Sequence, residues 1–424
     1  MTFFIEASFW LLVAIVGVLM VYTIRHYTFT ANRLFGRQRH PYVDVRVAKW
    51  PRITVLVPAH NEERVIGHIL DALVAGDYPH ESLTIIPVND RSTDGTREIV
   101  DAYAARYPAL IQPLHRSGGI AGKAAALREG SEKATGEILI VFDADYVPGA
   151  GLLRQLVAPF FDPQVGAVMG RVVPLNAGTN LLTRMLDLER SAGYQVDQQA
   201  RMNMRLVPQY GGTVGGVRMT ALDSVEGWRV DTLTEDTDLT YRLVLCGWDI
   251  VYQNRSECYE EVPEQWPVRI RQISRWAEGH NQALRDHAGA VLRGDLRGRQ
   301  RIDALLLLGV YVVPGLTLLG WMLALVLWYA GHAVNTWIAV LVIASFSTVG
   351  NFAAFFEVAA AARLDGHNRR VRLLPFLLFG FFVSQVAVVR SIFTFRRRTR
   401  DSNGDHEVKW HKTQRYRDPE CGLP

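Results

Sequence analysis

Four long apolar segments constrain the fold of this chain more than any other feature of its sequence. One covers about residues 7–24, and three follow residue 302, at about residues 304–330, 337–362 and 373–395. A helical segment of about 18 residues or more can cross the hydrocarbon core of a bilayer. The roughly 280 residues between the two apolar ends are enough for one sizeable α/β core. The sequence therefore predicts a membrane protein that carries one soluble domain.

The basic residues next to the apolar segments predict an orientation. No Lys or Arg precedes the first segment, no small-residue cleavage site follows it, and several Arg come directly after it. We therefore expect a retained anchor over residues 1–26, with the N-terminus outside and the soluble domain in the cytoplasm. This predicts a multi-pass protein of the inner (plasma) membrane, with helices at residues 302–396 and a cytoplasmic tail at residues 397–424.

The last apolar segment conflicts with this orientation. It lies between the basic sequences RLDGHNRRVR and FRRRTR, and a crossing would put the second of them outside. There are two ways to resolve the conflict. In the first, residues 373–395 lie in the interface or re-enter, which Pro375 and Arg390 would permit. In the second, the first of the three segments, interrupted by Pro314 and Gly315, holds a half-embedded helix as well as a span. The sequence leaves both alternatives open. Glu357 is expected to face protein or the interface.

Charge and cysteine content exclude some functions. The net charge of +4 is too small to indicate nucleic acid as a partner. Cys246, Cys258 and Cys421 are scattered, and no Cys/His spacing suits zinc. We therefore expect the cysteines to be reduced. The simpler interpretation is that each one is a small buried apolar residue.

The soluble segment, at about residues 50–290, alternates strands and helices. Three segments are strand-like: residues 53–57, LTIIPVND and EILIVFDAD. Helical patterns lie between them, at residues 61–75, where Asn61 is a candidate cap, and at STDGTREIVDAYAARY. This order predicts a parallel sheet with right-handed crossovers. Polar clusters follow the strands, at the edge where open α/β sheets place their ligands.

Several polar clusters could bind a diphosphate or a ribose or act as a base, although each has a simpler structural interpretation. Asp143 and Asp145 end a strand and suit Mg²⁺ or Mn²⁺ on a diphosphate, but they would also suit a solvated strand end. Asp90 could hold a ribose hydroxyl or cap a turn. The glycine loop before Lys123 could approach phosphate or be a flexible loop. Glu235 and Asp236 could supply a general base or stabilise a helix start. QISRW could bind ligand or belong to a helix on the membrane surface.

Taken in order, these motifs resemble the membrane-bound inverting glycosyltransferases of family 2, which include cellulose, chitin, hyaluronan and poly-N-acetylglucosamine synthases. The resemblance rests on VPAHNEE, VNDRSTDGT, GKAAALREG, FDADYVP, LTEDTDL and QISRW, over roughly residues 50–290. It implies an α/β GT-A fold, a Rossmann-like nucleotide-sugar-binding domain, with an α-helical transmembrane region.

The resemblance also implies roles for particular residues. Nucleotide-sugar contacts are expected at Ala59, His60, Asn61, Glu62, Asp90, Lys123, Asp143 and Arg275, with Asp90 on the uridine. Asp143 and Asp145 resemble the metal pair for Mg²⁺ or Mn²⁺, with Asp145 as the direct ligand. Asp236, next to Glu235, resembles the catalytic base. Gln272, Arg275 and Trp276 resemble the group that binds the diphosphate and the terminal sugar of the acceptor.

The implied reaction is an in-line displacement on a UDP-sugar that inverts the anomeric carbon. The full QxxRW motif and the helices after it favour a processive synthase that elongates and exports a β-linked polysaccharide. The alternative is a glycolipid synthase that adds one or two sugars to a membrane lipid, and a third is an inactive scaffold. Partners would be the growing glycan or lipid acceptor, membrane lipids, and accessory export subunits or a second copy of the chain. Residues 211–218 depart from the acceptor loop of many relatives, and the sugar and linkage stay open.

Overall fold

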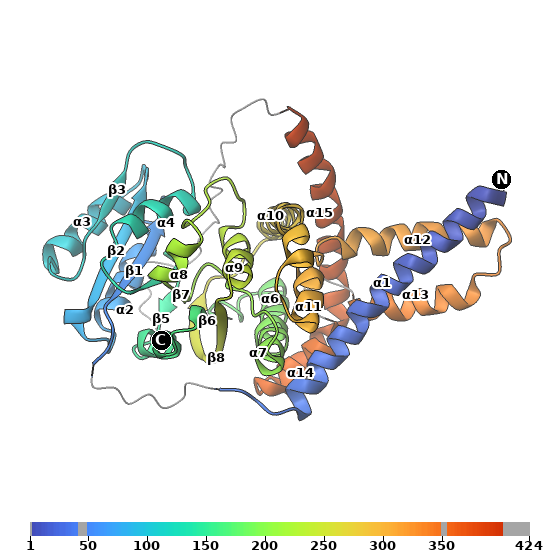
Figure 1. Ribbon diagram of the computed structural model, residues 1–424, viewed down its shortest axis with the longest axis horizontal. Coiled ribbons are helices and arrows are strands. Elements are labelled where there is room, and N and C mark those ends of the chain that lie inside the picture. Colours follow the sequence, from blue (N-terminus) through green and yellow to red (C-terminus); the bar gives the residue numbers. More distant parts are fainter. Residues whose placement is uncertain (1, 41–48, 349–353, 402–424) are drawn as a thin grey trace.

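The computed structural model describes residues 2–40, 49–348 and 354–401. An α/β domain built on one sheet lies at one end of the molecule, and a set of long helices extends from the other end (Figure 1). Most of the tail expected at residues 397–424 lies outside the described residues.

Eight strands of the described residues form one mixed sheet, in the order β3-β2-β1-β4-β7-β6-β8-β5. Their bounds are β1 Ile53–Ala59, β2 Leu83–Asp90, β3 Leu114–Arg116, β4 Ile138–Val141, β5 Val147–Pro148, β6 Val165–Pro174, β7 Gly215–Arg218 and β8 Asp249–Glu260. β1 pairs in parallel with β2 and β4, and β2 with β3, which confirms the predicted parallel half. The other half was not predicted, and in it β7 runs antiparallel to both β4 and β6.

The glycine-rich segment 211–218 supplies part of this sheet. Its second half is β7, at the centre between β4 and β6. A Cβ at Gly216 would lie only 2.6 Å from the side chain of Ile140, so glycine permits the close packing there. The segment is therefore a strand in its second half rather than an acceptor loop throughout.

Side chains alternate across β1 and bury both faces of the sheet. Val55 and Val57 face α2 (Ile66–Val74), α3 (Thr96–Arg106) and α5 (Leu152–Val157), whereas Leu56 faces α4 (Lys123–Glu132), α8 (Met219–Ser224) and α9 (Glu235–Leu245). The predicted helix start at Asn61 is wrong, because α2 begins only at Ile66. The sheet is thus covered on both sides, and only its edges and strand ends are left for ligands.

Two long helical segments connect the sheet to the apolar helices at the two ends of the chain. The first is α6 (Leu181–Ser191), which continues as the π-helix η3 (Ala192–Gln198) and then as α7 (Gln199–Met204). The second is α10 (Trp266–Arg293), which contains the QISRW motif.

The apolar ends form α1 (Thr2–Phe35), α11 (Gly298–Leu308), α12 (Val313–Tyr329), α13 (Asn335–Thr348), α14 (Phe355–Leu364), the 3-10 helix η4 (Asn368–Leu373) and α15 (Leu374–Asp401). By length and apolar composition, Phe3–Phe35 and Arg369–Ser391 could each cross a bilayer. The first C-terminal apolar segment, for which the sequence left open an interruption near Pro314 and Gly315, bends by 74° between α11 and α12. The second contributes α13 and α14, and residues 349–353 between them lie outside the described residues.

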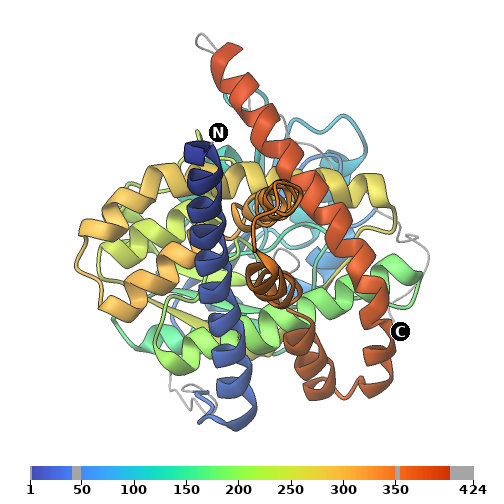
Figure 2. The same ribbon diagram turned by 90° about the vertical axis from the view of Figure 1, so that its right-hand side faces the viewer.

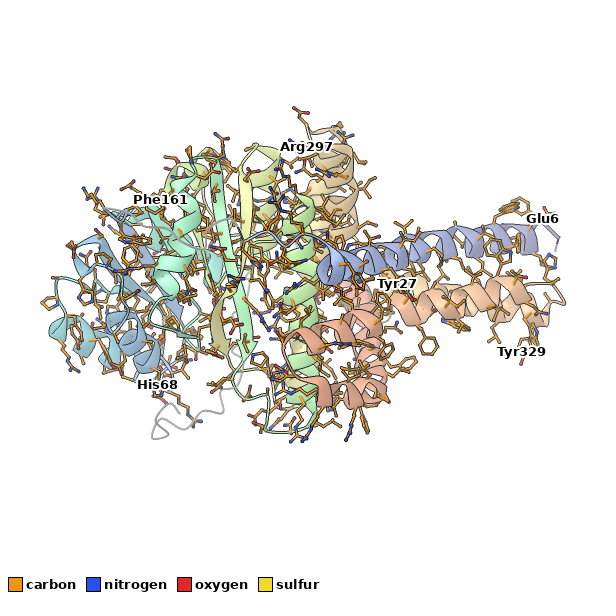
Figure 3. The ribbon with its side chains drawn as sticks, turned by 90° about the horizontal axis from the view of Figure 1, so that it is seen from below. Glu6, Tyr27, His68, Phe161, Arg297 and Tyr329 are labelled. Atoms are coloured by element: carbon orange, nitrogen blue, oxygen red, sulfur yellow. The ribbon has the colours of Figure 1, made fainter. Side chains whose placement is uncertain are left out.

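The helices α1, α12 and α13 pack together as a protruding bundle (Figures 1 and 3). Apolar side chains fill the contact between them, from Leu12 and Ile15 on α1 to Leu327 on α12 and Leu341 on α13. Van der Waals packing of this kind is what associates helices in lipid.

A cluster of buried charges joins the base of these helices to the α/β domain. Arg25 on α1 contacts Asp197 on η3 at 2.6 Å and Asp303 on α11 at 3.5 Å. Arg201 on α7 pairs with both of the same carboxylates. Glu357 on α14 faces protein, as predicted, because its carboxylate lies 2.5 Å from the ring of His26. These buried charges therefore bind five helical elements to one another, α1, η3, α7, α11 and α14.

Candidate active site

The site forms where β1, β2 and β4 end. Two residues there have a left-handed backbone, Asn61 after β1 with φ of 57° and Arg91 after β2 with φ of 56°. The Asn61 carbonyl oxygen Oδ1 accepts a hydrogen bond from the Thr93 N–H at 2.7 Å, and the Nδ1–H of His60 donates to the backbone oxygen of Asp90 at 2.7 Å. Such strained positions persist only where neighbouring groups hold them, and they concentrate at functional sites. The AHNE loop and the strand end at Asp90 thus form one rigid rim.

Asp90 lies inside this rim rather than at its surface. Its Oδ1 accepts from Arg116 Nη1 at 2.7 Å and from Arg91 Nε at 3.0 Å, and its Oδ2 accepts from the Gly122 N–H at 3.0 Å. Arg116 also donates to the Ile120 carbonyl at 2.8 Å. Asp90 therefore anchors the glycine loop that precedes Lys123, a role that its position after a strand did not reveal.

Lys123 brings the acidic clusters together. Its Nζ lies 2.6 Å from Asp143 Oδ1 and 3.5 Å from Glu235 Oε1. Burial by itself would lower the pKa of Lys123, but the carboxylates of Asp143 and Glu235 raise it well above its ordinary value. Three motifs that are far apart in the sequence thus converge on one ammonium group.

Asp236 lies beside this group at the start of α9. Burial raises its pKa above the ordinary carboxyl value, although the positive charge of Lys123 and the Thr237 N–H, which donates to Oδ1 at 2.7 Å, oppose the shift. Burial likewise raises the pKa of Glu235. The backbone of Gly212, with φ of +70°, packs so closely that a Cβ there would lie 2.9 Å from the Cβ of Asp236. A carboxylate held in place, with a raised pKa, suits a general base.

Asp238, in the same acidic cluster, has a different role. Its carboxylate contacts Arg242 Nη2 at 2.7 Å and His287 Nε2 at 2.9 Å. Burial would raise the pKa of Asp238, but the hydrogen bond from His287 and the charge of Arg242 hold it below the ordinary value. The structure thus separates Asp238, which is structural, from Asp236, which faces the site.

The two carboxylates of the DAD sequence have different surroundings. Asp143 contacts Lys123 and its side chain is 31% exposed, whereas Asp145 is buried. No group of three or more His, Cys, Asp or Glu gathers at one point in the part of the chain that the structure describes. Two carboxylates fit Mg²⁺ or Mn²⁺ when a substrate diphosphate supplies the remaining oxygens, since Mg²⁺ is usually bound in this way. The ammonium of Lys123 shows that the position already favours a cation.

The QISRW motif presents its residues on two sides of α10. Trp276 lies with the guanidinium carbons of Arg190 and Arg269 each 5.3 Å from its ring centroid, and Gln272 Oε1 accepts from Arg269 at 2.9 Å. Arg275 is exposed and has no hydrogen bond or ion pair with any described residue. Trp276 and Gln272 therefore face the site, and Arg275 is open to a ligand or to lipid.

Sequence reasoning missed the residues that hold Trp276. Arg190 on α6 pairs with Glu260 at 2.7 Å, and the Tyr146 hydroxyl donates to the other oxygen of Glu260 at 2.8 Å. Arg269 pairs with Glu189 at 2.5 Å. The position of Tyr146 directly after DAD was a usable signal, but nothing in the sequence of α6 distinguishes Arg190 from other surface arginines.

This arrangement defines a nucleotide-sugar-dependent transferase of the GT-A type. The sequence profile of the family described as "Glycosyltransferase like family 2" matches residues 51–279, more than half of the chain. The chain therefore belongs to glycosyltransferase family 2.

Relatives and a solved structure agree with this assignment. The chain is 29% identical to a probable glycosyltransferase, YdaM, of Bacillus subtilis, over 99% of both chains. It is 30% identical to a beta-monoglucosyldiacylglycerol synthase of Nostoc over 90% of this chain and 80% of the relative. The mannosyltransferase PcManGT of Pyrobaculum calidifontis, solved with GDP-Man and Mn²⁺, is similar with a TM-score of 0.60 and 21% identity over 92% of this chain and 99% of that chain. The last similarity confirms the GT-A fold.

Proposed function

We propose that this protein transfers a sugar from a nucleotide-sugar donor to the hydroxyl group of a membrane lipid, with inversion at the anomeric carbon. The proposal adopts the glycolipid alternative rather than the processive synthase that the sequence motifs favoured. UDP remains the expected nucleotide.

The packing of the membrane helices supports a lipid acceptor. A glycan in transit needs polar groups along its path, because buried hydroxyls without hydrogen bonds cost several kcal/mol each, on the order of 2–7. In the bundle of α1, α12 and α13, the described contact is mostly apolar, from Leu12 to Ala344, and one hydrogen bond joins two of the helices, from Trp321 Nε1 to Ser345 Oγ at 3.1 Å. Thr317 and Thr348, which are buried there, donate to their own helix backbones. This bundle is a packed anchor rather than a conduit.

The similarity to the Nostoc synthase supports the same acceptor class. A relative of 30% identity whose name specifies a monoglucosyl lipid product matches 90% of this chain over 80% of its own length. The chain also carries two helices able to cross a bilayer, which agrees with membrane association. A neutral lipid with a free hydroxyl, such as diacylglycerol, is therefore the first acceptor to test.

In the mechanism that we propose, Asp236 removes the proton from the acceptor hydroxyl as its oxygen attacks the anomeric carbon. The new carbon–oxygen bond forms on the face opposite the breaking bond, and the nucleoside diphosphate leaves with the bonding electrons. Lys123 and Arg275 supply positive charge to the diphosphate, and Trp276 positions the acceptor. Asp143 and Asp145 would hold Mg²⁺ or Mn²⁺, which supplies Lewis-acid stabilisation of the leaving group.

The test uses the full-length protein in nanodiscs that contain diacylglycerol, with a panel of radiolabelled UDP-sugars and Mg²⁺ or Mn²⁺. We expect one donor to give a label that extracts into organic solvent as a lipid with one or two sugars. Asp236→Asn should abolish it, while the exposed Asp223→Asn, a matched change of charge, should not. Labelled material of high molecular weight in the aqueous phase would instead establish a polysaccharide synthase.

A further inference from the structure

The helix α15 is apolar enough to cross a bilayer, yet it packs against the catalytic domain. Phe379 meets Trp266 of α10 with ring centroids 5.5 Å apart, and Ala387 and Val388 lie in one cluster with Ile273 of α10. The same part of α10 carries Arg269, Gln272 and Arg275, which bind within the domain or face solvent. Charged groups of this density are too costly in hydrocarbon, so α10 lies outside the bilayer core. The part of α15 that covers α10 must lie close to the same level.

The direction of α15 differs from that of the helices that protrude. In Figure 1, α12 and α13 extend sideways from the molecule while α15 runs along its height. In Figure 2, α12 and α13 are seen nearly end-on, and α15 is seen along its length in front of the domain. The two views agree that α15 crosses the base of the α12–α13 pair instead of running beside it.

The two faces of α15 have different surroundings. Leu377, Phe381 and Val388 are buried on the side of the domain, and Ser384 is buried with them. The opposite face carries large apolar side chains that are more than half exposed, Phe376, Phe382 and Val386, and Phe379 lies at its margin, where one side of its ring contacts Trp266 of α10. These residues recur at intervals of three or four, so they form one stripe along the helix. Since α15 lies between α10 and the protruding bundle in Figure 1, this stripe faces the side of the membrane.

We propose that α15 is an interfacial helix, which lies flat in the headgroup layer of the cytoplasmic leaflet with its phenylalanine stripe in the lipid and does not cross the bilayer. The bilayer surface is the partner that fits, because the stripe is continuous with the side of the molecule from which the membrane bundle projects. Arg369 and Arg372 precede the helix, together with Arg370, which pairs with Asp187 of α6, and the sequence RRRTR is its last part. With both basic groups on one side, each can bind anionic headgroups, and the conflict with the positive-inside rule is removed. The inference does not depend on which acceptor the enzyme uses.

Two native cysteines test the topology. Cys246 is exposed on the catalytic domain, and Cys421 lies in the tail beyond α15. Variants that retain only one of them, together with a cysteine-free variant that carries Ala333→Cys in the exposed turn between α12 and α13, are labelled with a membrane-impermeant maleimide in sealed vesicles of both orientations. We expect Cys421 and Cys246 to react in the same vesicles, and Ala333→Cys in the opposite ones. Reaction of Cys421 together with Ala333→Cys would overturn the proposal.

A depth measurement tests the flat orientation directly. Phe376→Cys and Val386→Cys are each labelled with bimane, and quenching by nitroxide lipids of different depth is compared. Ten residues of helix correspond to about 15 Å, so a spanning helix places the two probes at depths that differ by about that amount. For a flat helix we expect equal, shallow depths. A difference of about 15 Å would refute the proposal, and this holds even if one of the variants for maleimide labelling fails to fold.

Discussion

The packing of Gly212 against Asp236, the proposed catalytic base, gives a sharp prediction for one methyl group. In Gly212→Ala the new Cβ would lie 2.9 Å from Asp236 Cβ and 3.3 Å from Glu235 Oε1, whereas ordinary contact begins near 3.4 Å. Relief of the first contact requires a displacement of Asp236 of about half an ångström. Since a misplacement of about 1 Å can cost a catalytic group about 100-fold, we expect kcat to fall by about 10- to 100-fold. The KM for the donor should change little.

The positive φ of Gly212 requires a control for backbone strain. Alanine in the left-handed region costs roughly 1–2 kcal/mol at any position. Gly247 has φ of +86°, and a Cβ there would meet no atom within 4 Å. Gly247→Ala should therefore lower the thermal stability about as much as Gly212→Ala does, but leave kcat within about twofold of the wild type.

The test measures steady-state kcat for both variants, together with the thermal unfolding of the same preparations. The reasoning is refuted if Gly212→Ala retains wild-type kcat, because Asp236 then tolerates the displacement or is not the base. Equal losses of activity in the two variants would show that general loosening, rather than contact with Asp236, is responsible.

Three further predictions concern the charges of the site. Because Asp236 acts as a base only when ionised and burial raises its pKa, kcat should rise with pH through a pKa above the ordinary carboxyl range and be lost as pH falls; a flat profile from pH 4 to 7 would contradict this. Lys123→Met removes the charge that lowers this pKa, so the acidic limb of the pH–rate profile should move to higher pH, and an unmoved limb would exclude the coupling. Arg116→Met should lower the free energy of unfolding by about 3–5 kcal/mol, because it removes the buried one of the two arginines that pair with the buried carboxylate of Asp90, while the exposed Arg128→Met costs under about 1 kcal/mol in urea titrations.

Much of the parallel half of the sheet was readable from the sequence, because β1, β2 and β4 are short apolar runs that end in polar residues. The antiparallel half was not, since β7 consists of two glycines, Val217 and Arg218, a composition that predicts no strand. It forms because the small glycines allow close approach to Ile140. Tertiary packing here decides against local propensity.

The site shows the same division. Lys123, Asp143 and Asp236 could be found by motif, and the structure brings them together. The environment of each carboxylate could not be found by motif. Asp90, for example, is held inside the domain by Arg116, which is 26 residues away in the sequence. Likewise, hydropathy gave the extent of the apolar segment 304–330 but not its 74° bend, because a bend of this kind leaves the apolar composition unchanged.

The charge cluster at the base of the membrane helices bears on how the enzyme can be divided. A fragment confined to residues 50–290 would retain Asp197 and Arg201 but lose Arg25 and Asp303. It would also uncover the apolar surface of α6 and η3 that Phe29, Val358 and Leu377 cover in the whole chain. We therefore expect a fragment of these residues to aggregate in water unless this surface is redesigned as well as the anchor removed.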